Sequence, residues 1–326
     1  MIQIEDIRGL NIEVSSKCIG HCPFCSRRQK VRPYKDQLIT FSEFKRLPES
    51  FIKQLHIITF AGNFGDLCSN TELVDIAKYV KNINRTIRLG GDTNGSAQNE
   101  DWWKALGEAF HDGCMVFSLD GLENTHPLHR KGTNFKKTIR NIHAFTDGGG
   151  VAHWKFIVFE HNEHQVKTAK AMAKDIGCSR FFVISSRDYN EKLRIPKTFD
   201  FQMKREIFLS YGQKYKKKNK YAVCKPLNNG SIYIAADGTV HPCCFAHCMY
   251  ITEHNPLFQY IVPLIEKYHA DINFKTKPLQ GIVEGPYFKD VLYQSKTNDY
   301  CAIKCNKYKK EVRKKLVLHN SYFSEP

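Results

Sequence analysis

Residues 10–25 read LNIEVSSKCIGHCPFC, a short apolar run followed at once by three closely spaced cysteines. The run Leu10–Val14 predicts a β-strand, and Cys18, Cys22 and Cys25 follow it with the spacing C-x3-C-x2-C. Three such thiolates can hold three irons of a 4Fe–4S cubane, and the fourth iron then lacks a protein ligand. An open metal position is typical of a catalytic site. The spacing alone would also fit a zinc site with a remote fourth ligand, or three unpaired thiols.

Short apolar runs alternate with longer amphipathic ones along the first two thirds of the chain. Strand–helix units in series imply parallel strands with crossover helices, and six units fit a partial (β/α)6 barrel of the TIM type better than a closed one. Ligands gather at the carboxyl ends of such strands, where the cysteine triad lies. The expected strands are Leu10–Val14, Leu55–Phe60, Thr86–Leu89, Met115–Leu119, His153–Phe159 and Arg180–Ile184, and the expected helices are Phe41–Lys53, Thr71–Asn84, Glu100–His111, Asn134–Phe145 and Glu163–Ile176.

The pattern changes beyond about residue 200, where cysteines, short strands and a lysine-rich run replace the alternation. We expect an α/β barrel core over residues 1–200, a basic helix and linker over 201–221, and a smaller cysteine-rich α+β domain over 222–326. The elements expected after the core are a helix over Phe201–Tyr215, a strand over Ser231–Ala235, a turn at Asp237-Gly238, and helices around Pro256–Lys267 and Lys307–Leu318.

Composition limits the classes of protein that need consideration. The 326 residues include 12 cysteines and carry a formal net charge of +16. The start of the sequence lacks a signal peptide and no stretch is apolar enough to span a bilayer, so we expect a soluble, cytoplasmic protein with no membrane partner. In a reducing compartment, clustered cysteines indicate metal binding or catalysis rather than disulfides. The positive charge leaves an RNA or other anionic partner open.

The triad resembles the C-x3-C-x-Φ-C motif of the radical S-adenosylmethionine (radical SAM) superfamily, with Phe24 at the aromatic position. The resemblance implies that Cys18, Cys22 and Cys25 hold a catalytic 4Fe–4S cluster whose open iron binds the amino and carboxylate groups of S-adenosylmethionine (AdoMet). An electron from the cluster would cleave the sulfonium to a 5′-deoxyadenosyl radical. A reducing partner such as flavodoxin or ferredoxin is therefore expected.

Further residues match positions at which this family contacts AdoMet. The segment after the second strand resembles the glycine-rich segment that meets the methionine amino group, although the family commonly has a glutamate where this chain has Asp66. Residues at the end of the fourth strand and in the loop beyond it would contact the ribose and the methionine carboxylate. On their own, these residues would be interpreted as a tight turn and as strand-end caps. The cofactor contacts implied by the resemblance are Phe24, Gly62, Asn63, Gly65, Asp66, Ser118, Asp120 and Arg130.

The C-terminal cysteines resemble the opening of the auxiliary-cluster domains called SPASM and twitch. Cys224 and Cys243 flank Gly238, and the expected turn there would bring both cysteines to one site. With Cys301 and Cys305 they would complete one auxiliary 4Fe–4S cluster. A structural zinc site with four cysteines is the alternative.

Six C-terminal cysteines are too few for a full SPASM domain, which holds two auxiliary clusters and typically needs seven or more. A single, twitch-like cluster is the better expectation. Either of the remaining two, Cys244 or Cys248, would replace Cys301 or Cys305, or would help to hold a partial second cluster with a non-cysteine ligand.

These features predict a radical SAM enzyme that abstracts hydrogen from its substrate, with a peptide or protein placed first because of the C-terminal domain type. The alternatives are RNA, a nucleotide or a small alcohol as substrate. A rival from another class is a zinc-stabilised nucleic-acid-binding protein without catalysis. No general acid or base is assigned.

Overall fold

The computed structural model describes residues 2–186, 188–197, 224–252, 260–296, 298, 301 and 305. The helices expected over Phe201–Tyr215 and Lys307–Leu318, the linker 201–221 and the first residues of the helix expected at Pro256–Lys267 lie outside them. Within the described residues, no helix is long and apolar enough to cross a membrane.

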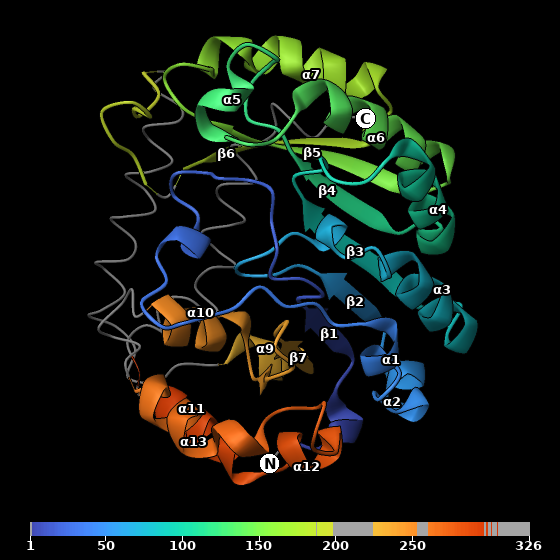
Figure 1. The fold of residues 1–326 in the computed structure, drawn as a ribbon, viewed down its shortest axis with the longest axis vertical. Helices are drawn as coiled ribbons and strands as arrows, with labels where there is room; N and C mark the ends of the chain where they lie inside the picture. The colour runs from blue at the N-terminus through green and yellow to red at the C-terminus, as the bar shows by residue number, and fades with distance from the viewer. Residues whose placement is uncertain are drawn as a thin grey trace.

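One sheet of eight strands runs the length of the molecule in the order β6-β5-β4-β3-β2-β1-β7-β8 (Figure 1). Strands β1 to β6 lie in sequence order and every neighbouring pair among them is parallel. This is the expected partial (β/α)6 barrel. The strands are β1 (Gly9–Ile12), β2 (Ile57–Phe60), β3 (Arg88–Thr93), β4 (Cys114–Ser118), β5 (Val151–Val158), β6 (Arg180–Ser185), β7 (Ser231–Ile234) and β8 (Val240–His241).

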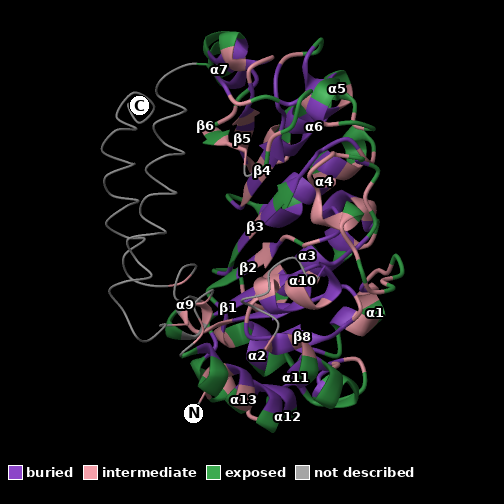
Figure 2. Ribbon diagram, turned by 90° about the vertical axis from the view of Figure 1, so that its left-hand side faces the viewer, coloured by how far each residue is buried: buried purple, intermediate pink, exposed green. Residues whose placement is uncertain are grey.

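Helices cover the outer face of the half-barrel (Figure 1). They are α3 (Leu73–Ile83), α4 (Glu100–Phe110), α6 (Phe135–Asp147) and α7 (Val166–Asp175). Side chains alternate along a strand, so Phe117 of β4 and Trp154 of β5 point outward and are fully buried. Phe117 packs against Trp103 of α4 and Phe145 of α6. Figure 2 shows the buried residues concentrated along the sheet. The alternate positions face the inside of the half-barrel.

The helix expected over Phe41–Lys53 is in fact two helices, α1 (Phe41–Phe44) and α2 (Glu49–Gln54). The break has a local cause, because Pro48 lacks an N–H and is the N-cap of α2. Upstream, Thr40 and Glu43 form a capping box that starts α1. Short helical turns complete the core: η1 (Ile4–Asp6), η2 (Ser26–Arg28), η3 (Leu67–Ser69), α5 (His126–His129) and η4 (Glu163–Gln165).

The C-terminal part joins the core sheet rather than forming a sheet of its own. β7 pairs parallel with β1, and β8 returns antiparallel to β7 through the turn at Gly238, where φ is +92°. The expected strand and turn are confirmed, but the hairpin continues the barrel sheet past β1. The helices that follow or precede it are α9 (Lys225–Asn228), α10 (Cys244–Thr252), α11 (Ile261–Tyr268), η6 (His269–Asp271), α12 (Leu279–Val283) and α13 (Pro286–Ser295).

The loop after β1 reaches this C-terminal part directly. In Figure 1 the loop, drawn in blue, passes beside α10. The backbone N–H groups of Val31 and Arg32 both donate to the carbonyl of Ile251, and the Arg32 guanidinium donates to the carbonyl of Tyr250. The segment that carries the cysteine triad is therefore held between the barrel core and α10.

Candidate functional site

The loops that leave the carboxyl ends of β1 to β4 meet at one end of the half-barrel, as expected for parallel strands. The cysteine triad leaves β1, residues 61–66 leave β2, residues 94–96 leave β3 and residues 119–121 leave β4.

The sulfurs of Cys18 and Cys22 both lie near the backbone of Gly20. A Cβ added at Gly20 would lie 3.4 Å from Cys18 Sγ and 3.8 Å from Cys22 Sγ, so both sulfurs lie beside this backbone. The Gly20 N–H donates to Cys18 Sγ at 3.3 Å. Cys25 closes the loop, because its N–H donates to the Cys22 carbonyl. The ring centroids of Phe24 and His129 lie 6.4 Å apart.

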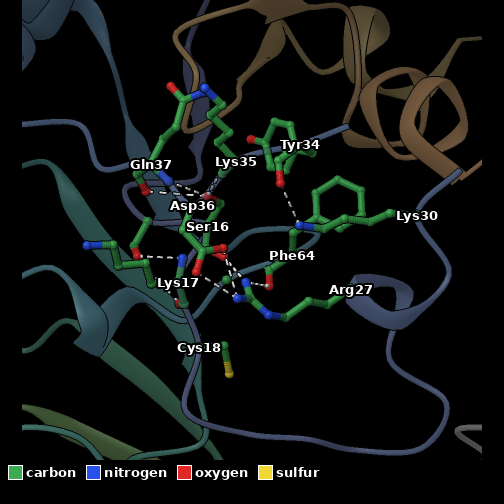
Figure 3. Close-up of polar contacts among 12 residues, drawn as sticks. Ser16, Lys17, Cys18, Arg27, Lys30, Tyr34, Lys35, Asp36, Gln37 and Phe64 are labelled. Carbon is green, nitrogen blue, oxygen red and sulfur yellow. Dashed lines mark hydrogen bonds and ion pairs between the residues drawn. The ribbon is translucent and has the colours of Figure 1, made fainter. Parts of the chain in front are cut away.

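Arg27, two residues beyond the triad, fixes this loop at its base (Figure 3). Its guanidinium donates to both oxygens of Asp36, at 2.8 and 2.9 Å. It also donates to the carbonyl of Ser16, which precedes the triad, and to the carbonyl of Phe64 in the loop after β2, at 3.3 Å. One side chain thus joins the two ends of the cysteine segment to the glycine-rich segment.

Asp66 is buried and connects the loops after β2 and β3. Its Oδ2 accepts from the backbone N–H and from the side-chain amide of Asn94, each at 2.6 Å. Its Oδ1 accepts from the Thr93 hydroxyl at 2.7 Å and from the N–H of Cys68. The Asn94 amide also lies 3.6 Å from Cys18 Sγ. The expected contact of Asp66 with the cofactor stays a prediction, and its carboxylate is already engaged by protein donors.

Gly62 and Gly65 are required by their close approach to the segment after β1. A Cβ at Gly62 would lie 2.3 Å from Glu13 Oε1, and one at Gly65 would lie 1.8 Å from the carbonyl oxygen of Ser15. By the family resemblance, these glycines belong to the segment that meets the methionine amino group. The structure gives a reason of its own for them, because the loop packs on Glu13 and Ser15.

Asp120 is fully buried at the end of β4 and binds two basic side chains, His129 and Arg130. Its Oδ1 accepts from the N–H of Ile157 at 2.7 Å, and its Oδ2 accepts from His129 Nδ1 at 2.7 Å and from Arg130 Nε. Burial opposes ionisation, but Arg130 and His129 outweigh it and hold the pKa of Asp120 below its usual range. Asp120 thus orients Arg130, whose positive charge acts on the Cys22 thiol. The expected contact of Asp120 with the cofactor stays a prediction, as does that of the buried Ser118.

Of the triad, the thiols of Cys18 and Cys22 favour the protonated state in the metal-free chain. Burial raises the pKa of Cys18 to about 12, and the charge of Asp66 adds to the effect. Burial also raises the pKa of Cys22, against the opposing charge of Arg130. Within the described part of the chain, no three His, Cys, Asp or Glu side chains are already arranged as a metal shell. The donor set nevertheless fits an iron–sulfur cluster, since three thiols on one loop deprotonate on binding metal and Arg130 offsets the charge of the thiolates.

All twelve cysteines are free of disulfides, and the C-terminal ones form two neighbourhoods. In the first, burial raises the pKa of Cys243 well above its usual range, and the thiols of Cys244, Cys224 and Cys301 add to the effect. Two further expected auxiliary ligands, Cys224 and Cys301, therefore lie within electrostatic reach of Cys243.

In the second neighbourhood, burial raises the pKa of Cys244 to about 11, with further contributions from Cys248 and Cys305. Cys305 also raises the pKa of Cys301. Cys244 thus belongs to both neighbourhoods, and the fourth expected ligand, Cys305, acts on a member of each.

Sequence reasoning did not single out Glu13 or Arg27 as site residues. Glu13 was counted within the apolar run of the first strand, and its charge between Ile12 and Val14 was the available signal. Arg27 gave no signal, because its partner Asp36 is nine residues away and nothing in the spacing relates the two.

Comparisons with known proteins agree with this geometry. The family description "Radical SAM superfamily" matches residues 12–172, and "Iron-sulfur cluster-binding domain", the SPASM domain, matches residues 224–306. Among the curated protein sequences, none matches significantly.

Solved structures at low sequence identity share the fold. The structure of anSMEcpe with bound AdoMet and Cp18Cys peptide has 17% identity and a TM-score of 0.57, over 93% of this chain and 85% of that one. Streptococcus suis SuiB bound to precursor peptide SuiA has 14% identity and a TM-score of 0.57, over 92% and 71%. BtrN in complex with AdoMet and 2-DOIA has 12% identity and a TM-score of 0.50, over 92% and 93%.

The two family matches cover most of the chain and place the cysteine triad and the C-terminal cysteines in the corresponding domains. A radical SAM domain implies AdoMet and a 4Fe–4S cluster, and a SPASM domain implies auxiliary iron–sulfur clusters. The chain therefore belongs to the radical SAM superfamily, as an enzyme with a C-terminal SPASM domain.

Proposed function

We propose that this enzyme abstracts a hydrogen atom from a peptide or protein that lies along the inner face of the half-barrel. When bound, AdoMet and the reduced 4Fe–4S cluster supply a 5′-deoxyadenosyl radical for this step. The proposal assigns the cluster to Cys18, Cys22 and Cys25. It assigns the surroundings of AdoMet to the loop 62–66 and to Arg130.

The side chains on the inner face of the strands carry this proposal. Lys155 of β5 lies in register with Ser118 at the carboxyl end of β4, and it forms an ion pair with Asp92 of β3. Beside it on β6, Phe182 and Ile184 are 37% and 39% exposed. A peptide offers apolar side chains together with backbone hydrogen-bonding groups, and it therefore matches a face that combines exposed apolar residues with a charged pair.

The similar structures support a peptide ahead of the alternatives. Two of them hold a peptide, Cp18Cys in anSMEcpe and the precursor SuiA in SuiB, whereas BtrN holds 2-DOIA. A reducing partner of the flavodoxin or ferredoxin type is part of the proposal.

For the C-terminal part, we propose one auxiliary cluster on Cys224, Cys243 and Cys301, with Cys305 as the fourth ligand. The contributions of Cys224 and Cys301 to the raised pKa of Cys243 support this assignment. The corresponding domain limits are a core over residues 1–200 and an auxiliary domain over 222–326, joined by 201–221.

The test compares the three substrate classes with a single preparation of the enzyme. Enzyme reconstituted without oxygen and reduced with dithionite is incubated with AdoMet and pools of peptides, of RNA or of small alcohols, and 5′-deoxyadenosine is quantified. We expect a peptide pool to raise its formation above the level without substrate. The proposal would be contradicted if RNA or small alcohols raised the formation of 5′-deoxyadenosine and no peptide pool did.

A pair of variants then tests the inner face. Lys155→Met should raise KM for the stimulating peptide and leave substrate-free cleavage of AdoMet unchanged. Lys78→Met is the control, because Lys78 is an exposed lysine on the outer helix α3. Equal KM values for the two variants would show that Lys155 does not contact the peptide.

A further inference from the structure

Glu13 is a buried carboxylate directly beneath the glycine-rich loop. It lies just beyond the end of β1 and is 1% exposed. Its Oε1 accepts from the N–H groups of Phe64 and Gly65, at 2.7 and 2.9 Å. Hydrogen bonds to a charged acceptor are stronger than neutral ones, so Glu13 fixes the direction of this stretch of backbone.

The second oxygen of Glu13 is bound from the C-terminal part of the chain. The hydroxyl of Tyr233, on β7, donates to Glu13 Oε2 at 3.0 Å, and Tyr233 is itself 1% exposed. The same hydroxyl accepts from the side-chain amide of Asn63 at 3.1 Å. That amide also donates to the carbonyl of Cys244 at 2.9 Å.

These contacts form a continuous hydrogen-bonded bridge, which we call the Glu13–Tyr233 bridge: Glu13, Tyr233, Asn63 and the Cys244 carbonyl. At one end is the loop 62–66, proposed above to surround AdoMet. At the other is the first turn of α10, directly after Cys243. Because Gly62 has no room for a Cβ against Glu13, the loop cannot shift toward Glu13 without disturbing the bridge.

We propose that Tyr233 is a positioning residue that couples the AdoMet loop to the auxiliary-cluster region. Through Glu13 and Asn63 it holds the loop in its binding conformation and ties that conformation to the environment of Cys243 and Cys244. Coupling between two sites is reciprocal, so AdoMet binding alters the auxiliary region and a change at the bridge alters AdoMet binding. This inference rests on the proposed place of AdoMet at residues 62–66.

The test uses Tyr233→Phe in the reconstituted holoenzyme, with Tyr268→Phe as the matched control. Tyr268 is another buried tyrosine of the C-terminal part, and its hydroxyl also donates to a carboxylate, that of Asp290 at 2.7 Å. Three quantities are measured: hydrogen exchange of peptides spanning residues 61–67 without AdoMet, the Kd for AdoMet, and the midpoint potential of the auxiliary cluster with and without AdoMet.

In Tyr233→Phe we expect faster exchange in residues 61–67, a Kd for AdoMet raised about tenfold by loss of one hydrogen bond to a charged group, and loss of the AdoMet-dependent shift in potential. Iron content should match that of wild type, and Tyr268→Phe should behave as wild type in all three measurements. Equal exchange and equal Kd in the two variants would overturn the proposal, as would a wild-type potential that AdoMet does not shift. Hydrogen exchange is measured without AdoMet, so it reports the bridge alone. Faster exchange in Tyr233→Phe with an unchanged Kd would mean that the bridge restrains the loop but AdoMet binds elsewhere, which is a failure of the proposed AdoMet site.

Discussion

At the scale of single residues, the site depends on side chains that orient other side chains. Asp66, Asp120 and Glu13 are buried carboxylates, and each accepts several hydrogen bonds from loops at the carboxyl ends of the strands. A buried carboxylate is stable only when its oxygens are so satisfied. The sequence indicated the cysteines and the glycines because their chemistry is tied to residue type. It did not indicate Glu13, because burial and partners 50 or more positions away follow from the fold alone.

Arg27→Gln should loosen the base of the cysteine loop. The variant loses the paired hydrogen bonds to Asp36 and the contacts with the Ser16 and Phe64 carbonyls. We expect retention of iron by the N-terminal cluster to fall severalfold, measured as iron per chain after dialysis against a chelator. The exposed neighbour Arg28→Gln is the control, and equal iron loss in both variants would refute this role.

Gly65→Ala should destabilise the chain because a methyl group has no space there. The new Cβ would lie 1.8 Å from the Ser15 carbonyl oxygen, so the backbone must move. We expect the free energy of unfolding to fall by about 2 kcal/mol or more in urea melts. Gly281→Ala is the control, because no heavy atom lies within 4 Å of its added Cβ and alanine favours helix. Equal stability of the two variants would contradict the geometry.

The partly buried thiol of Cys18 predicts how the stability of the metal-free chain depends on pH. The pKa of Cys18 is raised from 9.0 to about 12 in the folded chain, so the unfolded chain loses its proton first as the pH rises. The contribution of this protonated thiol to the free energy of unfolding is complete below about pH 9. It is lost between about pH 9 and 12, by at most about 1.4 kcal/mol per pH unit. In urea melts, the free energy of unfolding should fall less between pH 8.5 and pH 10 for Cys18→Ala than for wild type. An identical decrease would show that Cys18 does not contribute.

At the scale of elements, the strands and outer helices were predicted to within a few residues because their apolar periodicity is strong. The strand expected at Thr86–Leu89 is longer and continues to Thr93, since Gly90 and Gly91 lower the apolar signal without interrupting the sheet. Pro48 was a visible helix breaker that the expected helix Phe41–Lys53 passed over. The pairing of β7 with β1 could not be predicted, because periodicity identifies a strand and not its neighbour.

This pairing predicts that the core is not an independent folding unit. A fragment of residues 1–223 would expose the edge of β1 and leave Glu13 without Tyr233. We expect the fragment to unfold at lower temperature than the whole chain or to aggregate, as measured by circular dichroism and light scattering of the metal-free proteins. A monomeric fragment with an unchanged melting temperature would show that the two parts are independent.

At the scale of the whole molecule, one sheet carries both cysteine regions, with the triad after β1 and the C-terminal cysteines around β7, β8 and α10. The loop after β1 contacts α10, and the Glu13–Tyr233 bridge crosses the same junction. The sequence predicted two modules with two kinds of site, and their close integration follows only from the three-dimensional arrangement.

The central claim is that the triad carries radical SAM chemistry, and the most direct test is the formation of 5′-deoxyadenosine. Wild-type enzyme and the Cys18→Ala/Cys22→Ala/Cys25→Ala variant are reconstituted without oxygen, reduced with dithionite and incubated with AdoMet, with iron quantified in parallel. Wild type should form 5′-deoxyadenosine, and the variant should form none while retaining iron at its auxiliary site. No 5′-deoxyadenosine from wild type with a fully reduced N-terminal cluster, or equal amounts from both proteins, would contradict the claim.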